Sequence, residues 1–319
     1  MKKIKTTRNV KIKKVVTKGT ACQNCVWSWT IYVYWFIILF FIAATFYIIG
    51  RGHEFLSPTD RNFTVAEEVL KQSQDYADSA KEKIIAGDLE SAIVDLNAAI
   101  DANASAGVYI LRGEAYMQMG EYQNALSDFD SAIEVDGMNA VAFYDRALLN
   151  TRIENYEAAL NDVNNALAAQ SMKPVDVLSM RDLYAKRGQL NLWMKNWQGA
   201  IADYTNSLAR TEGSISADVY AERAEAYTAM GEYENAINDY TSAVRVISEQ
   251  IQAMPTQEIR EAQSSNAMSY FEKSAALNLQ LGRRDMAKSD LESAFAIATA
   301  LGDTESMERI QNLINGLNN

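Results

Sequence analysis

The sequence predicts an all-α fold: an α-solenoid of about six helix pairs with a C-terminal capping helix, preceded by one transmembrane helix. Two observations lead to this prediction. A 34-residue unit, most legible at Ala106–Asn139, reads as two amphipathic helices joined at Gly120 and Glu121, and close copies of it follow. Upstream, 24 consecutive residues carry no charge. Stacked copies of such a unit bury a continuous core that one copy cannot bury alone, so a period of this length predicts a solenoid.

Four positions of the unit hold the same kind of side chain in every copy. Counted from the first residue of each copy, position 8 is small: Ala80, Gly113, Ala147, Gly188, Ala224 and Ala275. Position 20 is alanine: Ala92, Ala125, Ala159, Ala200, Ala236 and Ala287. Position 24 is larger: Leu96, Phe129, Val163, Tyr204, Tyr240 and Leu291. Position 27 is small again: Ala99, Ala132, Ala166, Ser207, Ala243 and Ala294.

This order of small and large side chains resembles the tetratricopeptide repeat, with six units across residues 73–300. The resemblance implies a right-handed α-solenoid, and we assign residues 66–319 to this domain and its capping helix. The proline that is usual at position 32 of this repeat is missing. Gly137 and Ser171 stand there in the second and third units.

The first 25 residues contain eight basic side chains and no acidic one, and we expect them to form a cytoplasmic tail. Val26–Ile49 is the predicted transmembrane helix, because 24 residues at about 1.5 Å each can cross a hydrocarbon core of about 30 Å. A cleaved signal peptide is one alternative, although its apolar region is normally about 7–15 residues long. A buried core helix is another, but it would be expected to show a polar side.

The bias of basic residues toward the N-terminal side of the span predicts that the repeats lie outside the cytoplasm. The opposite orientation is the alternative. The basic tail and the span are also predicted to contact membrane lipids. Cys22 and Cys25 then fall on the reducing side of the membrane and are interpreted as ordinary thiols.

Residues 50–65 are predicted to be a linker, in which His53, the only histidine, is solvated. Asn62 and Asn103 each begin a glycosylation triplet, a pattern that is common by chance. Two insertions separate later units: a loop at 171–177 around Pro174, and a segment at 251–266 that Pro255 interrupts.

A last helix is predicted after Gly302 as the cap that closes the stack. One face of this helix is expected to carry Met307, Ile310, Leu313, Ile314 and Leu317. Five aromatic residues are expected at core positions of their repeats: Tyr109, Tyr122, Tyr156, Trp197 and Tyr233.

A charge pattern follows the same period. Aspartate holds position 23 in all six units: Asp95, Asp128, Asp162, Asp203, Asp239 and Asp290. Arginine holds position 7 in the four central ones: Arg112, Arg146, Arg187 and Arg223. A ligand-binding array is possible, but we favour a stacking role, in which each arginine binds an aspartate of a neighbouring helix. Each exposed pair is expected to contribute only about 0–1 kcal/mol.

The resemblance also implies a binding groove, because the first helix of each unit lines the concave face in this family. The predicted groove residues are Leu111, Glu114, Met117, Tyr144, Asp145, Leu148, Lys186, Gln189, Trp193, Glu222 and Glu225. A carboxylate-binding clamp is not supported, because acidic residues (Asp78, Asp145 and Glu222) stand at its positions. Trp193 either contacts a ligand or fills a gap between helices.

The sequence therefore predicts a membrane-anchored scaffold or adaptor that binds protein partners, as basic, helical or extended peptides, on the extracytoplasmic side. An accessory structural subunit of a larger membrane complex (for translocation, envelope assembly or energy transduction) is the alternative. A formal net charge of −11 disfavours nucleic acid as a partner. No catalytic, cofactor or metal motif is recognisable, so an enzyme is not expected.

Overall fold

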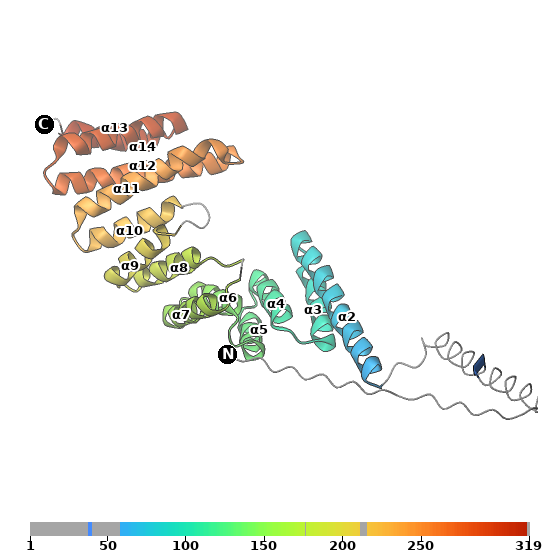
Figure 1. The fold of residues 1–319 in the computed structure, drawn as a ribbon. Helices are drawn as coiled ribbons and strands as arrows, with labels where there is room; N and C mark the ends of the chain where they lie inside the picture. Colours follow the sequence, from blue (N-terminus) through green and yellow to red (C-terminus); the bar gives the residue numbers. More distant parts are fainter. Residues whose placement is uncertain (1–37, 40–57, 176, 211–215, 318–319) are drawn as a thin grey trace, which may run out of the picture. The chain divides into compact units, whose positions relative to one another are not determined.

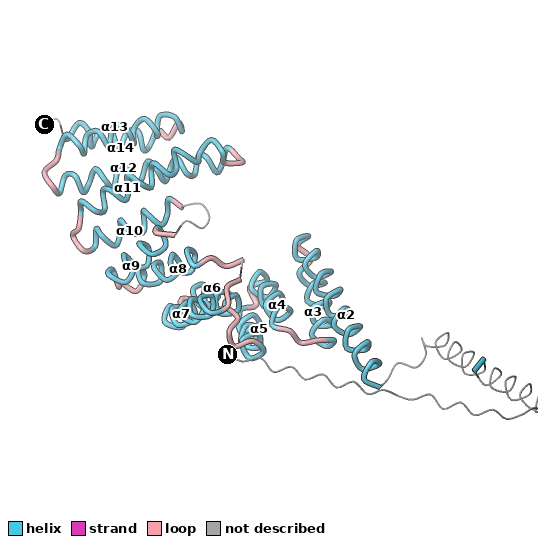
Figure 2. Tube along the Cα trace, in the orientation of Figure 1, coloured by secondary structure: helices cyan, strands magenta, loops and turns pink. Residues whose placement is uncertain are grey.

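The computed structural model describes residues 38–39, 58–175, 177–210 and 216–317, and gives the backbone alone for residues 58–63. The chain divides into two compact units, Met1–Glu67 and Glu68–Asn319. In the described part, every regular element is helical and no strand occurs (Figure 2). No helix described there has the length and apolar character needed to cross a membrane. The predicted span at residues 26–49 lies outside the described residues except for Ile38 and Leu39, and so do the basic tail, Cys22, Cys25 and His53.

From residue 58 onward the α-helices follow one another in antiparallel pairs (Figure 1). In chain order they are α2 (Pro58–Ala86), α3 (Leu89–Ala102), α4 (Ala106–Met119), α5 (Tyr122–Val135), α6 (Ala140–Arg152), α7 (Tyr156–Met172), α8 (Met180–Trp193), α9 (Trp197–Leu208), α10 (Ala217–Ala229), α11 (Tyr233–Gln250), α12 (Gln257–Gln280), α13 (Arg284–Leu301) and α14 (Thr304–Leu317). A single 3-10 turn, η1 (Ile251–Ala253), continues α11.

The turn within each helix pair has the same backbone conformation in all six units. The residue at position 15 has a positive φ. It is glycine in four units: Gly87, Gly120, Gly231 and Gly282. Glu154 and Lys195 adopt it with φ of 62° and 60°. A left-handed residue at a helix end returns the chain sharply, and glycine adopts it without a Cβ penalty. Three of the following helices, α3, α7 and α9, begin at a side-chain cap, as where the Asn155 side chain accepts from the Ala158 amide.

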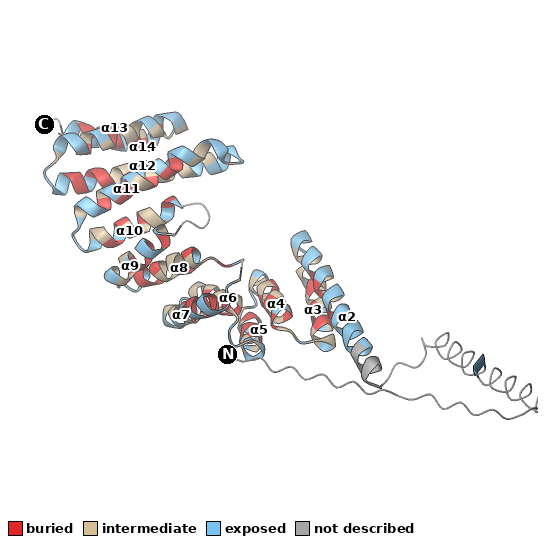
Figure 3. Cartoon of the chain, viewed as in Figure 1, coloured by how far each residue is buried: buried red, intermediate tan, exposed pale blue. Residues whose placement is uncertain are grey.

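The predicted grid of small and large side chains forms the core. Every residue at positions 8, 20, 24 and 27 is buried, and Figure 3 shows buried segments in red along the helices of the stack. The two glycines at position 8 have a specific cause. A Cβ on Gly113 would lie 2.7 Å from Cε1 of Phe129, and one on Gly188 would lie 2.8 Å from Cδ1 of Tyr204. In these two units the glycine leaves the space that an aromatic ring fills at position 24.

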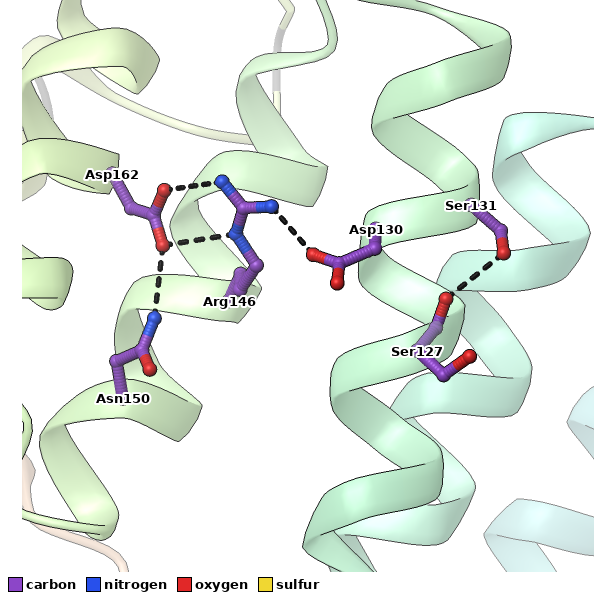
Figure 4. A network of polar contacts seen from close by, with 6 residues as sticks. All are labelled: Ser127, Asp130, Ser131, Arg146, Asn150 and Asp162. Atoms are coloured by element: carbon purple, nitrogen blue, oxygen red, sulfur yellow. Dashed lines mark hydrogen bonds and ion pairs between the residues drawn. The ribbon is translucent and has the colours of Figure 1, made fainter.

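The predicted arginine–aspartate pairs are present in all four central units. In α6 and α7, Nε and Nη2 of Arg146 donate to the two oxygens of Asp162, at 3.0 and 2.6 Å (Figure 4). The amide of Asn150 donates to the same carboxylate at 3.0 Å. The side chain of Asp162 is 3% exposed and that of Arg146 is 21% exposed, so the expectation that these pairs are solvent-exposed is wrong for the aspartate. A buried carboxylate without its partner is costly.

The third arginine nitrogen makes a contact that the charge pattern did not reveal. Nη1 of Arg146 donates to Asp130 on α5, in the preceding unit, at 2.6 Å (Figure 4). The other three arginines reach the same position of the preceding second helix: Arg112 to Asn97, Arg187 to Asn164 and Arg223 to Thr205. Each arginine thus joins three helices and fixes one unit on the next. The end units have serine instead, Ser79 and Ser274, each donating to its aspartate.

Three helix boundaries differ from the sequence prediction. Helix α2 begins at Pro58, inside the segment assigned to the linker, because proline is well suited to the first helical position. Helix α7 continues to Met172, into the predicted loop at 171–177. The segment after Pro255 is helical from Gln257 and extends α12 at its N-terminus, where Thr256 accepts from the amide of Ile259. Helix α14 ends the stack as predicted, but Leu313 is 48% exposed while Ile310 is buried.

The five aromatic residues expected at core positions are half-buried rather than buried, and each packs against a core cluster with one edge exposed. Asn103 of the second glycosylation triplet caps the C-terminal end of α3, in the connection to α4. Asn62 belongs to the residues whose side chains are not described.

Candidate functional site

The predicted groove residues lie on first helices of successive units, which we call the first-helix face. Helix α4 carries Leu111, Glu114 and Met117; α6 carries Tyr144, Asp145 and Leu148; α8 carries Lys186, Gln189 and Trp193; and α10 carries Glu222 and Glu225. Asp145 is buried, Trp193 and Glu225 are exposed, and the others are half-buried. Side chains with this partial exposure can contact a ligand while they stay packed against their neighbours.

Hydrogen bonds join the face across α8 and α10. Gln189 donates from Nε2 to Oε1 of Glu222 at 3.1 Å, and Lys186 donates to Oε1 of Gln189, also at 3.1 Å. The hydroxyl of Tyr204, from the core, donates to Oε2 of Glu222 at 2.9 Å. Burial raises the pKa of Glu222 although both hydrogen bonds oppose this, and burial lowers the pKa of Lys186. In this part of the face, the polar side chains form hydrogen bonds with one another.

The next contact extends the face to α12. Lys273 donates to Oε1 of Glu225 at 2.7 Å and lies over the ring of Tyr240, 5.7 Å from its centroid. Lys273 was missing from the sequence prediction. It holds position 6 of the sixth unit, the position of Lys186 and Glu222, so the period itself could have identified it.

Glu114 and Asp145 differ from the other charged residues of the face. Asp145 is 8% exposed, and its buried Oδ2 accepts no hydrogen bond among the described residues. Burial and then the charge of Glu114 raise the pKa of Asp145 to about 7. Burial also raises the pKa of Glu114. Two carboxyl groups on the first helices of successive units therefore interact electrostatically, and neither forms an ion pair among the described residues.

A cavity of about 530 Å³ opens at the N-terminal ends of the first helices. It is lined by Gln74, Ala77, Lys81, Ser105, Gly107, Val108, Ile110, Leu111, Asp136, Met138, Asn139, Ala140, Val141, Lys173, Val175 and Val177. Most of these side chains are apolar. The two lysines are paired, Lys81 with Asp78 at 2.8 Å and Lys173 with Asp136 at 3.1 Å. The loop at 171–177 thus helps to wall the cavity, as does Leu111 from the predicted set.

Trp193 fills a gap between helices, which is one of the two alternatives left open for it, and its exposed side leaves contact with a ligand as a prediction. Its ring packs against Tyr156 of α7, with centroids 5.4 Å apart, and so fills space between helices. It is nevertheless 45% exposed, with the ammonium of Lys186 5.6 Å from its ring centroid. An exposed aromatic ring held by a neighbour is a suitable contact for a peptide.

A metal site is not seen among the described residues, where no group of three His, Cys, Asp or Glu side chains is placed to hold an ion.

Comparison with known proteins identifies the repeat. The family model described as tetratricopeptide repeat matches residues 106–137 and 217–249. Serine/threonine-protein phosphatase 5 of Rattus norvegicus is 33% identical over 112 residues, which is 35% of this chain and 22% of that protein. RNA polymerase II-associated protein 3 of Xenopus tropicalis is 31% identical over 97 residues, 30% of this chain and 14% of that protein. The chain therefore matches less than a quarter of the length of these relatives.

Two solved structures share the fold at low sequence identity. The pilF protein of Pseudomonas aeruginosa has a TM-score of 0.55 at 17% identity, covering 77% of this chain and 98% of that one. YrrB, titled a TPR protein with an unusual peptide-binding site, has a TM-score of 0.52 at 17% identity, covering 68% of this chain and 97% of that one. The chain therefore contains tetratricopeptide repeats, arranged in the described part as an all-α solenoid.

Proposed function

We propose that this chain is a membrane-anchored scaffold whose first-helix face binds a protein partner through an extended or helical peptide segment. Residues 26–49 anchor the chain, the basic tail lies in the cytoplasm against membrane lipids, and the repeats are displayed on the other side. The observation that supports peptide binding is the cavity of about 530 Å³, which opens on the first helices of adjacent units and is lined mainly by apolar side chains. Apolar pockets that continue into a polar face are suited to anchoring side chains of a peptide.

Site-directed photocrosslinking tests this proposal on the full chain in its native membrane. Benzoylphenylalanine at Leu111 lies on the wall of the cavity. The same group at Val94 is a matched control, because Val94 is 66% exposed on the second helix α3. We expect a partner adduct from Leu111 and none from Val94. Equal labelling from both positions, or none from Leu111, would contradict binding at this face.

Topology and anchoring need their own measurement. In right-side-out vesicles, added protease should digest the repeats and leave the N-terminal tail protected. Protection of the repeats would support the opposite orientation instead. The alternative function, an accessory subunit of a larger membrane complex, predicts that residues 1–65 alone co-purify with that complex in detergent, whereas a scaffold requires the repeats.

A further inference from the structure

We propose that Glu114 and Asp145 bind one lysine or arginine side chain of the peptide partner, while a neighbouring apolar side chain of the same peptide enters the cavity beside Leu111. This inference rests on the proposed function and specifies the chemistry of the partner. It would make the first-helix face a receptor for a short apolar and basic motif.

The buried carboxyl group of Asp145 is the first feature that favours a basic ligand. Asp145 is more than nine-tenths buried, and its Oδ2 has no donor among the described residues. Other acidic residues of the same face are provided for: Glu222 accepts from Gln189 and Tyr204, and Glu225 from Lys273. A buried carboxylate is retained at a cost unless something pairs with it. At Asp145 the paired state requires a donor from outside the described fold.

The presence of two acidic side chains, Glu114 and Asp145, also favours a cation. Glu114 is the neighbour whose charge acts on Asp145, so the pair is acidic on both sides. Two carboxyl groups match one guanidinium or ammonium group, which carries several donors and a positive charge. A divalent metal would demand more ligands than two, and the described residues offer no third acidic, His or Cys side chain in a suitable group.

The position of the cavity favours an apolar residue close to the basic one in the peptide. Leu111 lines the cavity and precedes Glu114 by three residues on α4, and Val141 lines it and precedes Asp145 by four on α6. The acidic pair is therefore about one helical turn, ~5.4 Å along each helix, from the apolar lining. Alternate residues of an extended peptide are spaced by roughly 6.6 Å on the same side. An apolar residue and a basic residue two positions apart match this arrangement.

Ionisation adds a consequence for binding. Because burial and Glu114 raise the pKa of Asp145 to about 7, a bound cation favours the charged form and lowers that pKa. Peptide binding should therefore release protons near neutral pH.

The test uses the full chain in lipid nanodiscs and a positional-scanning library of decapeptides. Lysine or arginine should be enriched at one position, with an apolar residue near it. For a selected peptide, replacing that lysine by norleucine should weaken binding to the wild type by tenfold or more, measured by fluorescence polarisation. With Asp145→Asn and Glu114→Gln the same replacement should change affinity by less than about threefold.

Glu249→Gln is the control, since Glu249 lies on the second helix α11, outside the first-helix face, and is paired with Arg245. It should keep the preference for a basic residue. Circular dichroism establishes that each variant is folded. Selected peptides without a basic residue, or a lysine preference that persists in both variants, would overturn the inference and leave peptide binding standing. If no peptide is selected, both the inference and the proposed function fail.

Discussion

At the residue scale, the arginine of each central unit joins its own helix pair to the preceding unit. Its guanidinium binds a buried aspartate of its own unit and a side chain of the preceding one. The hydrogen bonds that Arg187 donates to Asp203 raise the pKa of Arg187 above its usual value, so the guanidinium stays charged. These contacts agree with the stacking role that the sequence predicted for the recurring arginines and aspartates.

Arg187→Ala should therefore destabilise the chain by roughly 3 kcal/mol, because it leaves the buried carboxylate of Asp203 with the Asn191 amide alone. Arg245→Ala is the matched control: its pair with Glu249 is exposed on both sides and should contribute about 0–1 kcal/mol. Urea denaturation followed by circular dichroism measures both. Equal losses for the two variants would refute a special role for the buried rung.

Asp145→Asn should stabilise the chain, and the gain should depend on pH. The pKa of Asp145 is raised from 3.8 to about 7 in the folded state. Below pH ~4 the carboxyl is protonated in both states and contributes nothing. As pH rises from ~4 to ~7 the unfolded chain ionises and the folded chain does not, so wild-type stability falls, by at most ~4 kcal/mol, and then stays constant.

Denaturation of the wild type and of Asp145→Asn at several pH values between 4 and 8 gives the difference directly. Titrating groups that do not interact with Asp145 occur in both proteins and cancel, whereas Glu114 loses the charge of Asp145 in the variant and contributes to the difference. The advantage of the variant should be small at pH 4 and grow to a plateau above pH 7. Parallel stability curves at all pH values would show that Asp145 is not desolvated in the folded chain.

At the element scale, the helices could be predicted from the sequence, but several of their ends could not. The period of small residues identified each pair because it is set by local packing, which repeats identically. The end of α7 and the start of α12 lie in the insertions, where no period applies. The Thr256 cap and the helix-forming residues after it determine that α12 begins at Gln257, and this became visible only with the structure.

The turn at position 15 gives a prediction for an element. Lys195 takes φ of 60° where four other units have glycine. A residue with a Cβ in the left-handed conformation costs about 1–2 kcal/mol in the folded state. Glycine removes this strain, but its greater conformational freedom in the unfolded chain offsets part of the gain. Lys195→Gly should thus stabilise by about 0.5–1 kcal/mol in thermal denaturation. Gly120→Ala has the opposite sign, since Gly120 has φ of 80° and no neighbour within 4 Å of an added Cβ, so strain alone acts.

At the scale of the whole molecule, the solenoid of the described part and the residues of its first-helix face could be predicted from the repeat. The hydrogen-bond partners and neighbours of those residues could not be predicted from it. Whether Glu222 meets Gln189, or Asp145 meets only Glu114, depends on the spacing between first helices of different units, which is set by distant packing. The cavity has the same origin, because its wall includes a loop that lies more than sixty residues from Gly107 in the chain.

The end of the stack tests how far one unit affects another. The sequence placed Ile310 and Leu313 on the same core face of α14, but Ile310 is fully buried and Leu313 is 48% exposed. Ile310→Ala should cost about 2–4 kcal/mol, and Leu313→Ala on the same helix should cost little. Because each unit of a solenoid contacts its neighbours alone, hydrogen exchange should accelerate in α12 and α13, where the cluster around Ile310 lies. Exchange in α4 and α5 should not change. A uniform increase along the chain would instead show that the repeats unfold as one cooperative body, in which case binding at the first-helix face would be coupled to the C-terminal cap.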